Sequence, residues 1–194
     1  LTMNNGKDKL YTKGRSGENA GTDITNLLNI IDVEYESTNY AIRGEIIMSN
    51  ENFEYFKDTE AHPRNTVAGI VNSKTINVEK AESTTYVGYE VIEPWLPFDE
   101  QMKIIEETGI EVVKHELVDD FNLELLIEKY REHTIDSTYE CDGIIISQNN
   151  PEKRNTEGDP KYAFAFKNLD DLETQDVNVT NITWQISKDG YIKP

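Results

Sequence analysis

The stretch YAIRGEIIM, residues 40–48, is rich in β-branched and other apolar residues and predicts a β-strand. Successive side chains of a strand point to opposite faces, so Arg43 and Glu45 share one face while Ile42 and Ile46 share the other. A guanidinium and a carboxylate are costly to bury on a mostly apolar strand. The strand therefore indicates either a structural Arg–Glu contact at a sheet edge or a carboxylate that faces a ligand hydroxyl or a metal.

Outward from that strand, short apolar runs interleave with helical patterns. We expect further strands at residues 86–92, 110–117, 143–147, 162–167 and 181–186, and helices at residues 24–31, 98–109 and 123–133. The glycine-rich, polar stretch at residues 12–25 predicts a loop. The elements lack the strict βαβ order of a doubly wound sheet. The pattern therefore predicts an α+β domain with largely antiparallel sheets.

The composition excludes several classes of protein. A chain of 194 residues with 37% hydrophobic residues can bury a core, and it has no apolar run typical of a membrane-spanning helix or a signal peptide. The single cysteine, Cys141, excludes a disulfide framework and a cysteine-rich zinc site, and we expect its thiol to be buried. The net charge of −18 argues against a basic nucleic-acid coat protein. Together these features predict an intracellular protein without a membrane partner.

Three short segments carry side chains suited to chemistry. In YAFAFK (162–167), the phenylalanines are expected to face the core, and small alanines on the other face lead to Lys167, which either reaches solvent or lies beside a ligand. HPRNTVAG (62–69) predicts a turn-like loop that offers Arg64 to a phosphate, since a guanidinium suits phosphate geometry. ECDGIII places Asp142 before a strand that looks buried, which is also compatible with an ordinary turn.

The order of six motifs resembles the nucleotidyltransferase (adenylation) domain of NAD+-dependent DNA ligases, whose members show TRGDG, GEDVT, VRGE, NPRNxAAG, DGVVxK and WAxAxK. The corresponding segments here are TKG (12–14), TDIT (22–25), IRGE (42–45), PRNTVAG (63–69), DGIII (142–146) and YAFAFK (162–167). PRNxxxG between RGE and DG favours the NAD+-dependent branch over ATP-dependent ligases and capping enzymes. The end of the chain, from residue 182, resembles the segment that opens the family's OB-fold.

The resemblance implies a fold and a division of the chain. It implies the nucleotidyltransferase, ATP-grasp-like ligase fold, built from antiparallel sheets with flanking helices. Residues 1–176 would form an adenylation domain that lacks its N-terminal part, and residues 177–194 would begin an OB-fold.

The resemblance also implies roles for matched residues around the nucleoside. Glu45 would act in catalysis by accepting hydrogen bonds from the ribose. Tyr89 would stack on one face of the adenine, and Ile145 would cover the other.

The remaining matched residues are cationic or acidic and belong to the phosphate end. Lys167, the second residue with an implied catalytic role, would stabilise charge at the α-phosphate, and Lys13 would lie near the nucleotide phosphates. Arg64 would lie on the nicotinamide-nucleotide or DNA-phosphate side, and Asp142 would join the cofactor-binding set. These positions suit AMP transfer, which needs cations where phosphoryl charge develops.

Several residues depart from the family pattern. The KxDG motif that carries the family's nucleophilic lysine does not occur in these 194 residues, and the similar string SKDG (187–190) has the wrong spacing. Ser147 stands at the DGVVxK lysine, and Asn72 stands at a second expected arginine. The chain is therefore either a piece of an active ligase, or of a split enzyme, or a catalytically silent relative. The retention of Glu45, Tyr89 and Lys167 favours the first.

The resemblance implies a reaction with stated participants. AMP would pass from NAD+ through a lysine outside this chain to the 5′-phosphate of nicked double-stranded DNA, with Mg2+ offsetting phosphate charge. The missing domains of the same enzyme, or a second subunit, would complete it, and its source would be bacterial or viral. The alternatives are an ATP-dependent RNA ligase or capping-type nucleotidyltransferase, and a subunit that binds a nucleotide or a partner without chemistry.

Overall fold

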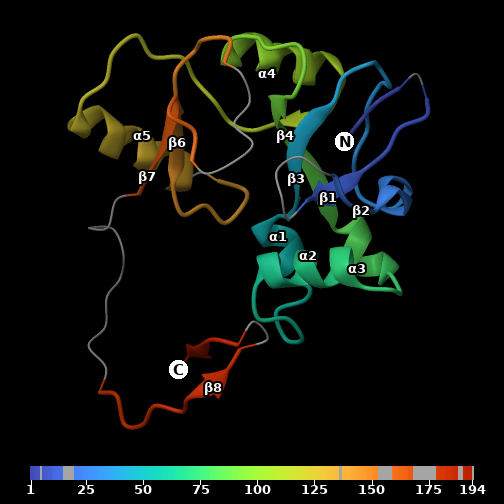
Figure 1. Cartoon of the computed structure of the whole chain (residues 1–194), viewed down its shortest axis with the longest axis vertical. Coiled ribbons are helices and arrows are strands. Elements are labelled where there is room, and N and C mark those ends of the chain that lie inside the picture. The colour runs from blue at the N-terminus through green and yellow to red at the C-terminus, as the bar shows by residue number, and fades with distance from the viewer. Residues whose placement is uncertain are drawn as a thin grey trace.

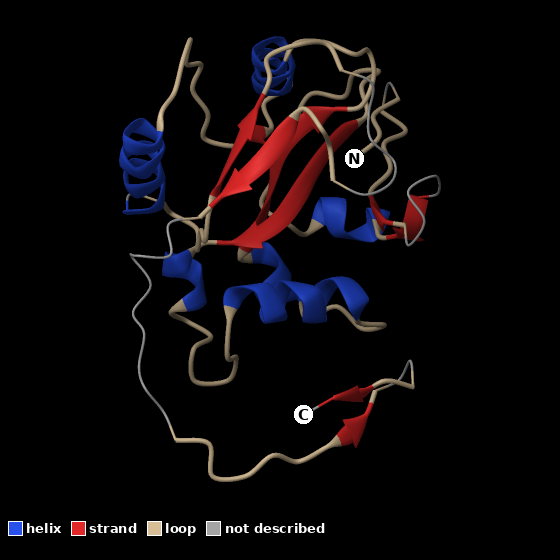
Figure 2. Ribbon diagram, turned by 60° about the vertical axis from the view of Figure 1, so that its left-hand side comes forward, coloured by secondary structure: helices blue, strands red, loops and turns tan. Residues whose placement is uncertain are grey.

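A three-stranded sheet forms the centre of the molecule, in the order β3-β4-β5 (Figure 1). The computed structural model describes residues 1–4, 6–14, 20–135, 137–152, 159–167, 178–187 and 190–193. Strand β3 (Ile42–Met48) runs antiparallel to β4 (Thr84–Val91), and the short β5 (Glu111–Val112) runs parallel to β4. Figure 2 shows the long strands in the middle of the molecule with helices around them.

One face of this sheet is covered by the main hydrophobic core. Ile42 on β3 and Val91 on β4 are fully buried, together with Met102 and Ile105 of helix α4 (Phe98–Glu107). Two carboxylates occupy the first turn of α4, where the helix dipole favours negative charge. The chain leaves this helix through Gly109, whose φ of 86° suits glycine.

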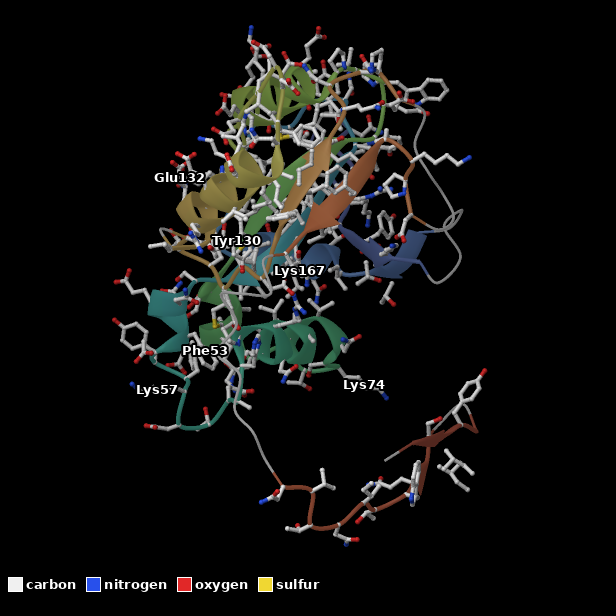
Figure 3. The ribbon with its side chains drawn as sticks, turned by 90° about the vertical axis from the view of Figure 1, so that its left-hand side faces the viewer. Phe53, Lys57, Lys74, Tyr130, Glu132 and Lys167 are labelled. Carbon is white, nitrogen blue, oxygen red and sulfur yellow. The ribbon has the colours of Figure 1, made fainter. Side chains whose placement is uncertain are left out.

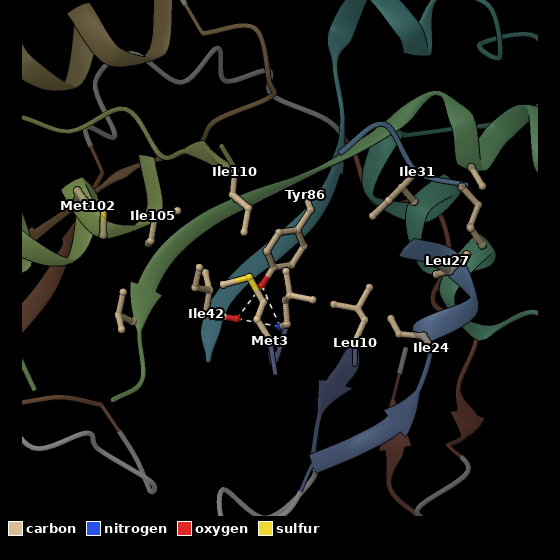
Figure 4. Close-up of a cluster of buried hydrophobic side chains, with 14 residues drawn as sticks. Met3, Leu10, Ile24, Leu27, Ile31, Ile42, Tyr86, Met102, Ile105 and Ile110 are labelled. Atoms are coloured by element: carbon tan, nitrogen blue, oxygen red, sulfur yellow. Dashed lines mark hydrogen bonds between the residues drawn. The ribbon is translucent and has the colours of Figure 1, made fainter. Parts of the chain in front are cut away.

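The N-terminal segment completes that core. Strands β1 (Tyr11–Lys13) and β2 (Ala20–Asp23) form an antiparallel pair, followed by the 3-10 helix η1 (Thr25–Asn29). Figure 4 shows the cluster that they build against the sheet, where the Tyr86 hydroxyl donates to the Ile42 carbonyl at 2.9 Å. The buried members from the N-terminal segment are Leu1, Met3, Leu10, Ile24, Leu27 and Ile31.

Three short helices gather at one end of the central strands (Figure 1). They are α1 (Asn50–Phe53), α2 (Pro63–Asn72) and α3 (Val78–Glu82). A small second core, formed by Met48, Phe56 and Val67, joins α2 to the end of β3.

A second antiparallel pair consists of β6 (Ile144–Ser147) and β7 (Ala163–Phe166), with helix α5 (Leu123–Ile135) beside it. The Phe166 ring meets Tyr130 of α5 edge-on, with 6.2 Å between the ring centroids. Towards the C-terminus, β8 (Gln185–Ile186) and β9 (Ile192–Lys193) form a further antiparallel pair.

The structure confirms the mixed α+β class with largely antiparallel sheets and corrects several local expectations. Residues 62–69 are not a turn-like loop, because Pro63 opens a ten-residue helix at a position where its missing N–H costs nothing. The stretch 12–25 contains the β1–β2 pair, although residues 15–19 lie outside the described part of the chain. Within residues 24–31, Thr25–Asn29 form a 3-10 helix rather than an α-helix. The strands expected at 110–117 and 181–186 shrink to two residues each.

Two side chains are more exposed than expected. The Cys141 thiol is exposed and donates to the Gly143 carbonyl at 3.0 Å, so it is not a buried structural group. Phe164 remains 48% exposed, and its ring centroid lies 6.2 Å from that of Phe121 in the segment before α5. The expected domain boundary after residue 176 falls outside the described residues.

Candidate functional site

The outward face of the β3–β4 hairpin carries the first group of candidate residues. Arg43 is paired with Glu90 and Gly44 with Gly88, so that Tyr89 is the extra residue at an irregularity in β4. Such an irregularity re-aims the side chains next to it. The Arg43 Nη1 atom lies 2.5 Å from Glu90 Oε2, with side-chain exposures of 44% and 11%. The predicted Arg–Glu contact therefore exists, but its acid is Glu90 rather than the neighbouring Glu45.

Glu45 and Tyr89 lie within electrostatic reach of each other on this face. Burial raises the pKa of Tyr89 above its ordinary value. The Arg43 charge lowers this pKa, and the carboxylates of Glu90 and Glu45 raise it. The Glu45 side chain is exposed, and within the described residues it forms no ion pair. The structure thus presents a carboxylate and a partly exposed tyrosine together.

The glycine of the IRGE motif is required by packing. A Cβ atom on Gly44 would lie 2.3 Å from the Val87 carbonyl oxygen and 2.6 Å from Cζ of Tyr86. Both neighbours belong to β4, and one is backbone, so no side-chain rotation relieves the clash. Gly44 therefore fixes how closely β3 and β4 approach beside Glu45.

The second group of candidate residues lies at the end of the β6–β7 pair. Lys167 follows β7 directly (Figure 3), and its Nζ lies 2.5 Å from Oδ2 of Asp142, just before β6. A Cβ atom on Gly143 would lie 3.0 Å from Lys167 Cγ and 2.9 Å from the Phe166 carbonyl oxygen. The glycine of the DG motif therefore leaves the space through which the lysine side chain passes.

Arg64 joins this second group from helix α2. The hydrogen bond from Lys167 holds the pKa of Asp142 below its ordinary value. Burial opposes this lowering, and the charge of Arg64 lowers the pKa further. Arg64 lies in the first turn of α2, a helix where the sequence predicts a loop. Three residues separated widely in the sequence, Arg64, Asp142 and Lys167, are thus brought together.

Two further candidate residues are exposed. Ile145 is 71% exposed on β6, opposite Ala165 of β7. Lys13 ends β1 with an exposed side chain. Among the described contacts, no hydrogen bond or ion pair connects either residue with the Lys167 group.

Sequence reasoning missed Glu90, which fixes Arg43. The signal for it was weak, because an acidic residue in YVGYEVI could equally face solvent. Only the strand register places Glu90 opposite Arg43, and the irregularity at Tyr89 shifts that register by one residue.

Metal binding and membrane insertion have no support in the described ranges. No group of three or more histidine, cysteine or acidic side chains there could hold a metal ion. None of the helices in the same ranges is long and apolar enough to cross a membrane.

Comparison with known proteins places this geometry in a family. Residues 9–170 match the model of the NAD-dependent DNA ligase adenylation domain. The chain is 41% identical over 201 aligned positions to a DNA ligase of Acanthamoeba polyphaga mimivirus, covering 100% of this chain and 31% of that protein. It is 33% identical to the putative DNA ligase 205R of Invertebrate iridescent virus 6, covering 97% of this chain and 32% of that protein.

A bacterial relative gives the same result at lower identity. The DNA ligase of Lachnoclostridium phytofermentans is 26% identical, covering 100% of this chain and 32% of that protein. The chain thus spans about a third of the length of these relatives. The match over residues 9–170 agrees with the motifs and with the mixed α+β fold. The chain therefore belongs to the NAD-dependent DNA ligase adenylation-domain family, which has the nucleotidyltransferase fold.

Proposed function

We propose that this chain holds the adenylyl donor, NAD+, in a DNA ligase that transfers AMP to the 5′-phosphate of nicked double-stranded DNA. The observation that carries the proposal is the division of candidate residues into two groups. Glu45 and Tyr89 present an acceptor and an aromatic ring, whereas Lys167, fixed by Asp142 at 2.5 Å, lies with Arg64. A nucleotide has the same division, with hydroxyls and a base at one end and phosphates at the other.

The first group suits the nucleoside. The exposed Glu45 carboxylate accepts hydrogen bonds from vicinal ribose hydroxyls, because an ionised carboxylate is an acceptor only. The ring of Tyr89, 37% exposed, offers a face for stacking on adenine. Ile145 is 71% exposed, and by covering the other face of the base it would remove apolar surface from contact with water.

The second group suits the phosphates. An ammonium has three donors, so Lys167 keeps its bond to Asp142 and still donates to a phosphate oxygen. Asp142 holds the ammonium at one place, and such preorganised charge stabilises the charge that develops during phosphoryl transfer. Arg64 supplies a second cation that matches phosphate geometry, on the nicotinamide-nucleotide or DNA side. Lys13 is the third cation that we assign to the phosphates.

The nucleophile and the metal are not assigned to this chain. Its sequence contains no KxDG, so we propose that the lysine that carries AMP belongs to a part of the protein outside these residues. We propose that Mg2+ offsets phosphate charge in the complete enzyme, and we assign no residue of this chain to hold it. We assign residues 1–176 to the adenylation domain and 177–194 to the start of an OB-fold. The family match ending at residue 170 supports this division.

A second candidate function is nucleotide binding without chemistry. Ser147 favours it, because this residue occupies the β6 position where the family pattern has a lysine. An intracellular site of action is proposed for either function, supported by the single cysteine.

Calorimetric titration of the 194-residue chain with NAD+, and separately with ATP, tests the proposal. We expect saturable binding of NAD+ and weaker binding of ATP. Glu45→Ala should lose about tenfold to 150-fold in NAD+ affinity, since a hydrogen bond to a charged group is worth about 1.5–3 kcal/mol. The exposed α4 variant Glu106→Ala serves as the matched control. Equal NAD+ affinity in Glu45→Ala and the control would contradict the proposed nucleoside site.

A further inference from the structure

His62 makes two contacts through opposite atoms of its ring. It precedes helix α2, and its Nδ1 accepts a hydrogen bond from the backbone N–H of Arg64 at 3.1 Å. Its Nε2 lies 2.9 Å from Oε2 of Glu140. Since Nδ1 is an acceptor in the first contact, the proton of a neutral imidazole sits on Nε2 and is donated to Glu140.

The choice of histidine at this position is informative. Helix N-caps favour Ser, Thr, Asp and Asn, and helices α1 and α3 are capped in that way by Ser49 and Asn77. A cap needs one acceptor, and a short side chain supplies it. The imidazole supplies the same acceptor and, on its far side, a donor that reaches another segment of the chain.

That other segment leads directly to the Lys167 group. Glu140 lies two residues before Asp142, which holds Lys167 at 2.5 Å. The same helical turn that His62 caps also carries Arg64, whose charge acts on Asp142. The first turn of α2 therefore contacts residues 140–142 through His62, and the charge of Arg64 acts on the same segment.

We infer that His62 is a positioning residue, whose hydrogen bond to Glu140 fixes residues 140–142 against the first turn of α2 and so directs Lys167 towards the phosphates. The inference rests on the proposed function of Lys167. It adds His62 to the site as a residue that acts through Glu140 rather than by touching the ligand. The side chains of His62 and Glu140 are 42% and 57% exposed. An exposed pair contributes little to stability, so its loss should alter the site much more than the folding.

The test compares variants that separate the two contacts of His62. His62→Asn keeps a capping acceptor for the Arg64 N–H but is too short to reach Glu140, and Glu140→Ala removes the same contact from the other side. Glu140→Gln keeps an acceptor oxygen and is the conservative rescue. Asn77→Ala is the matched control. It removes the cap of α3, in which the Lys80 backbone N–H donates to Asn77 Oδ1 at 3.1 Å.

Two readouts are measured on the full 194-residue chain. The first is the NMR titration of the Asp142 carboxyl carbon, which reports the contact with Lys167, and the second is NAD+ affinity by calorimetry. We expect His62→Asn and Glu140→Ala to raise the Asp142 midpoint towards its ordinary value and to weaken NAD+ binding about three- to tenfold. The double variant should be no worse than either single variant, because both remove one contact. Glu140→Gln and Asn77→Ala should stay near the wild type.

Failure of the inference can be distinguished from failure of the proposed function. If Lys167→Ala weakens NAD+ binding while His62→Asn leaves both readouts at wild-type values, the inference is overturned and the proposed site stands. If Lys167→Ala leaves NAD+ affinity unchanged, the proposed phosphate site is wrong, whatever His62 does. A raised Asp142 midpoint in His62→Asn would even then support the positioning contact itself.

Discussion

Removal of the Arg43 guanidinium should destabilise the protein, because it leaves the Glu90 carboxylate without its cationic partner. In the structure the two groups lie 2.5 Å apart, and the side chains of Arg43 and Glu90 are 44% and 11% exposed. Breaking a fully buried pair from one side costs about 3–5 kcal/mol, whereas a surface pair is worth about 0–1 kcal/mol. Because the arginine is half-exposed, we expect Arg43→Gln to lie between these limits and to lower the free energy of unfolding by about 2–3 kcal/mol.

Urea denaturation followed by circular dichroism measures this change. With a slope of about 1–3 kcal/mol per molar urea, the midpoint of Arg43→Gln should fall by about 1–2 M. The double variant Arg43→Gln with Glu90→Gln should recover most of the loss, since a neutral amide then replaces the mostly buried carboxylate. Lys9→Gln, which removes the exposed partner of Asp23 at 3.4 Å, is the control and should shift the midpoint little. A loss below about 0.5 kcal/mol in Arg43→Gln, or a double variant less stable than the single one, would refute the reasoning.

Three further predictions concern the site. Incubation of the 194-residue chain with NAD+ should give no lysine–AMP adduct by mass spectrometry, because its sequence contains no KxDG; a detected adduct would contradict this. In the complete ligase, Lys167→Ala should lower adenylyl transfer by about 10²–10³-fold, which is the scale for removing one preorganised electrostatic donor. Lys167→Arg should recover only part of this activity. Full activity of a folded alanine variant would show that the assignment is wrong. Because Lys167 lowers the pKa of Asp142 from its ordinary 3.8, this contact stabilises the fold above that pH and its contribution is lost as the pH falls through the folded-state value. Lys167→Met should therefore raise the Asp142 midpoint in an NMR titration and erase that acid-dependent contribution, and an unchanged midpoint would exclude the contact.

The elements that local patterns specify well were predicted from the sequence. Alternation located β3 and β4, and Pro97 with Gly109 bracketed α4, because these signals depend only on neighbouring residues. Helix α2 was missed because its capping side chain is a histidine, which is not among the usual N-cap residues, and Pro63 was taken as a turn signal.

The candidate site depended more on tertiary structure. Motif order predicted that Asp142 and Lys167 belong to one site, but their ion pair needs the β6–β7 register, which brings together residues 25 apart in sequence. The partner of Arg43 could not be found from alternation alone, because the irregularity at Tyr89 changes which residue faces it. The phenylalanines of β7 share a face as expected, yet Phe164 remains 48% exposed.

The central claim is that the Glu45–Tyr89 group and the Lys167–Asp142 group bind the two ends of one NAD+ molecule. Titration of the isotopically labelled chain with NAD+, followed by two-dimensional NMR, tests it most directly. We predict that the resonances of both groups shift together along one saturation curve, while that of the exposed Lys103 on α4 does not move. Shifts confined to one group, or different saturation curves for the two groups, would contradict the claim.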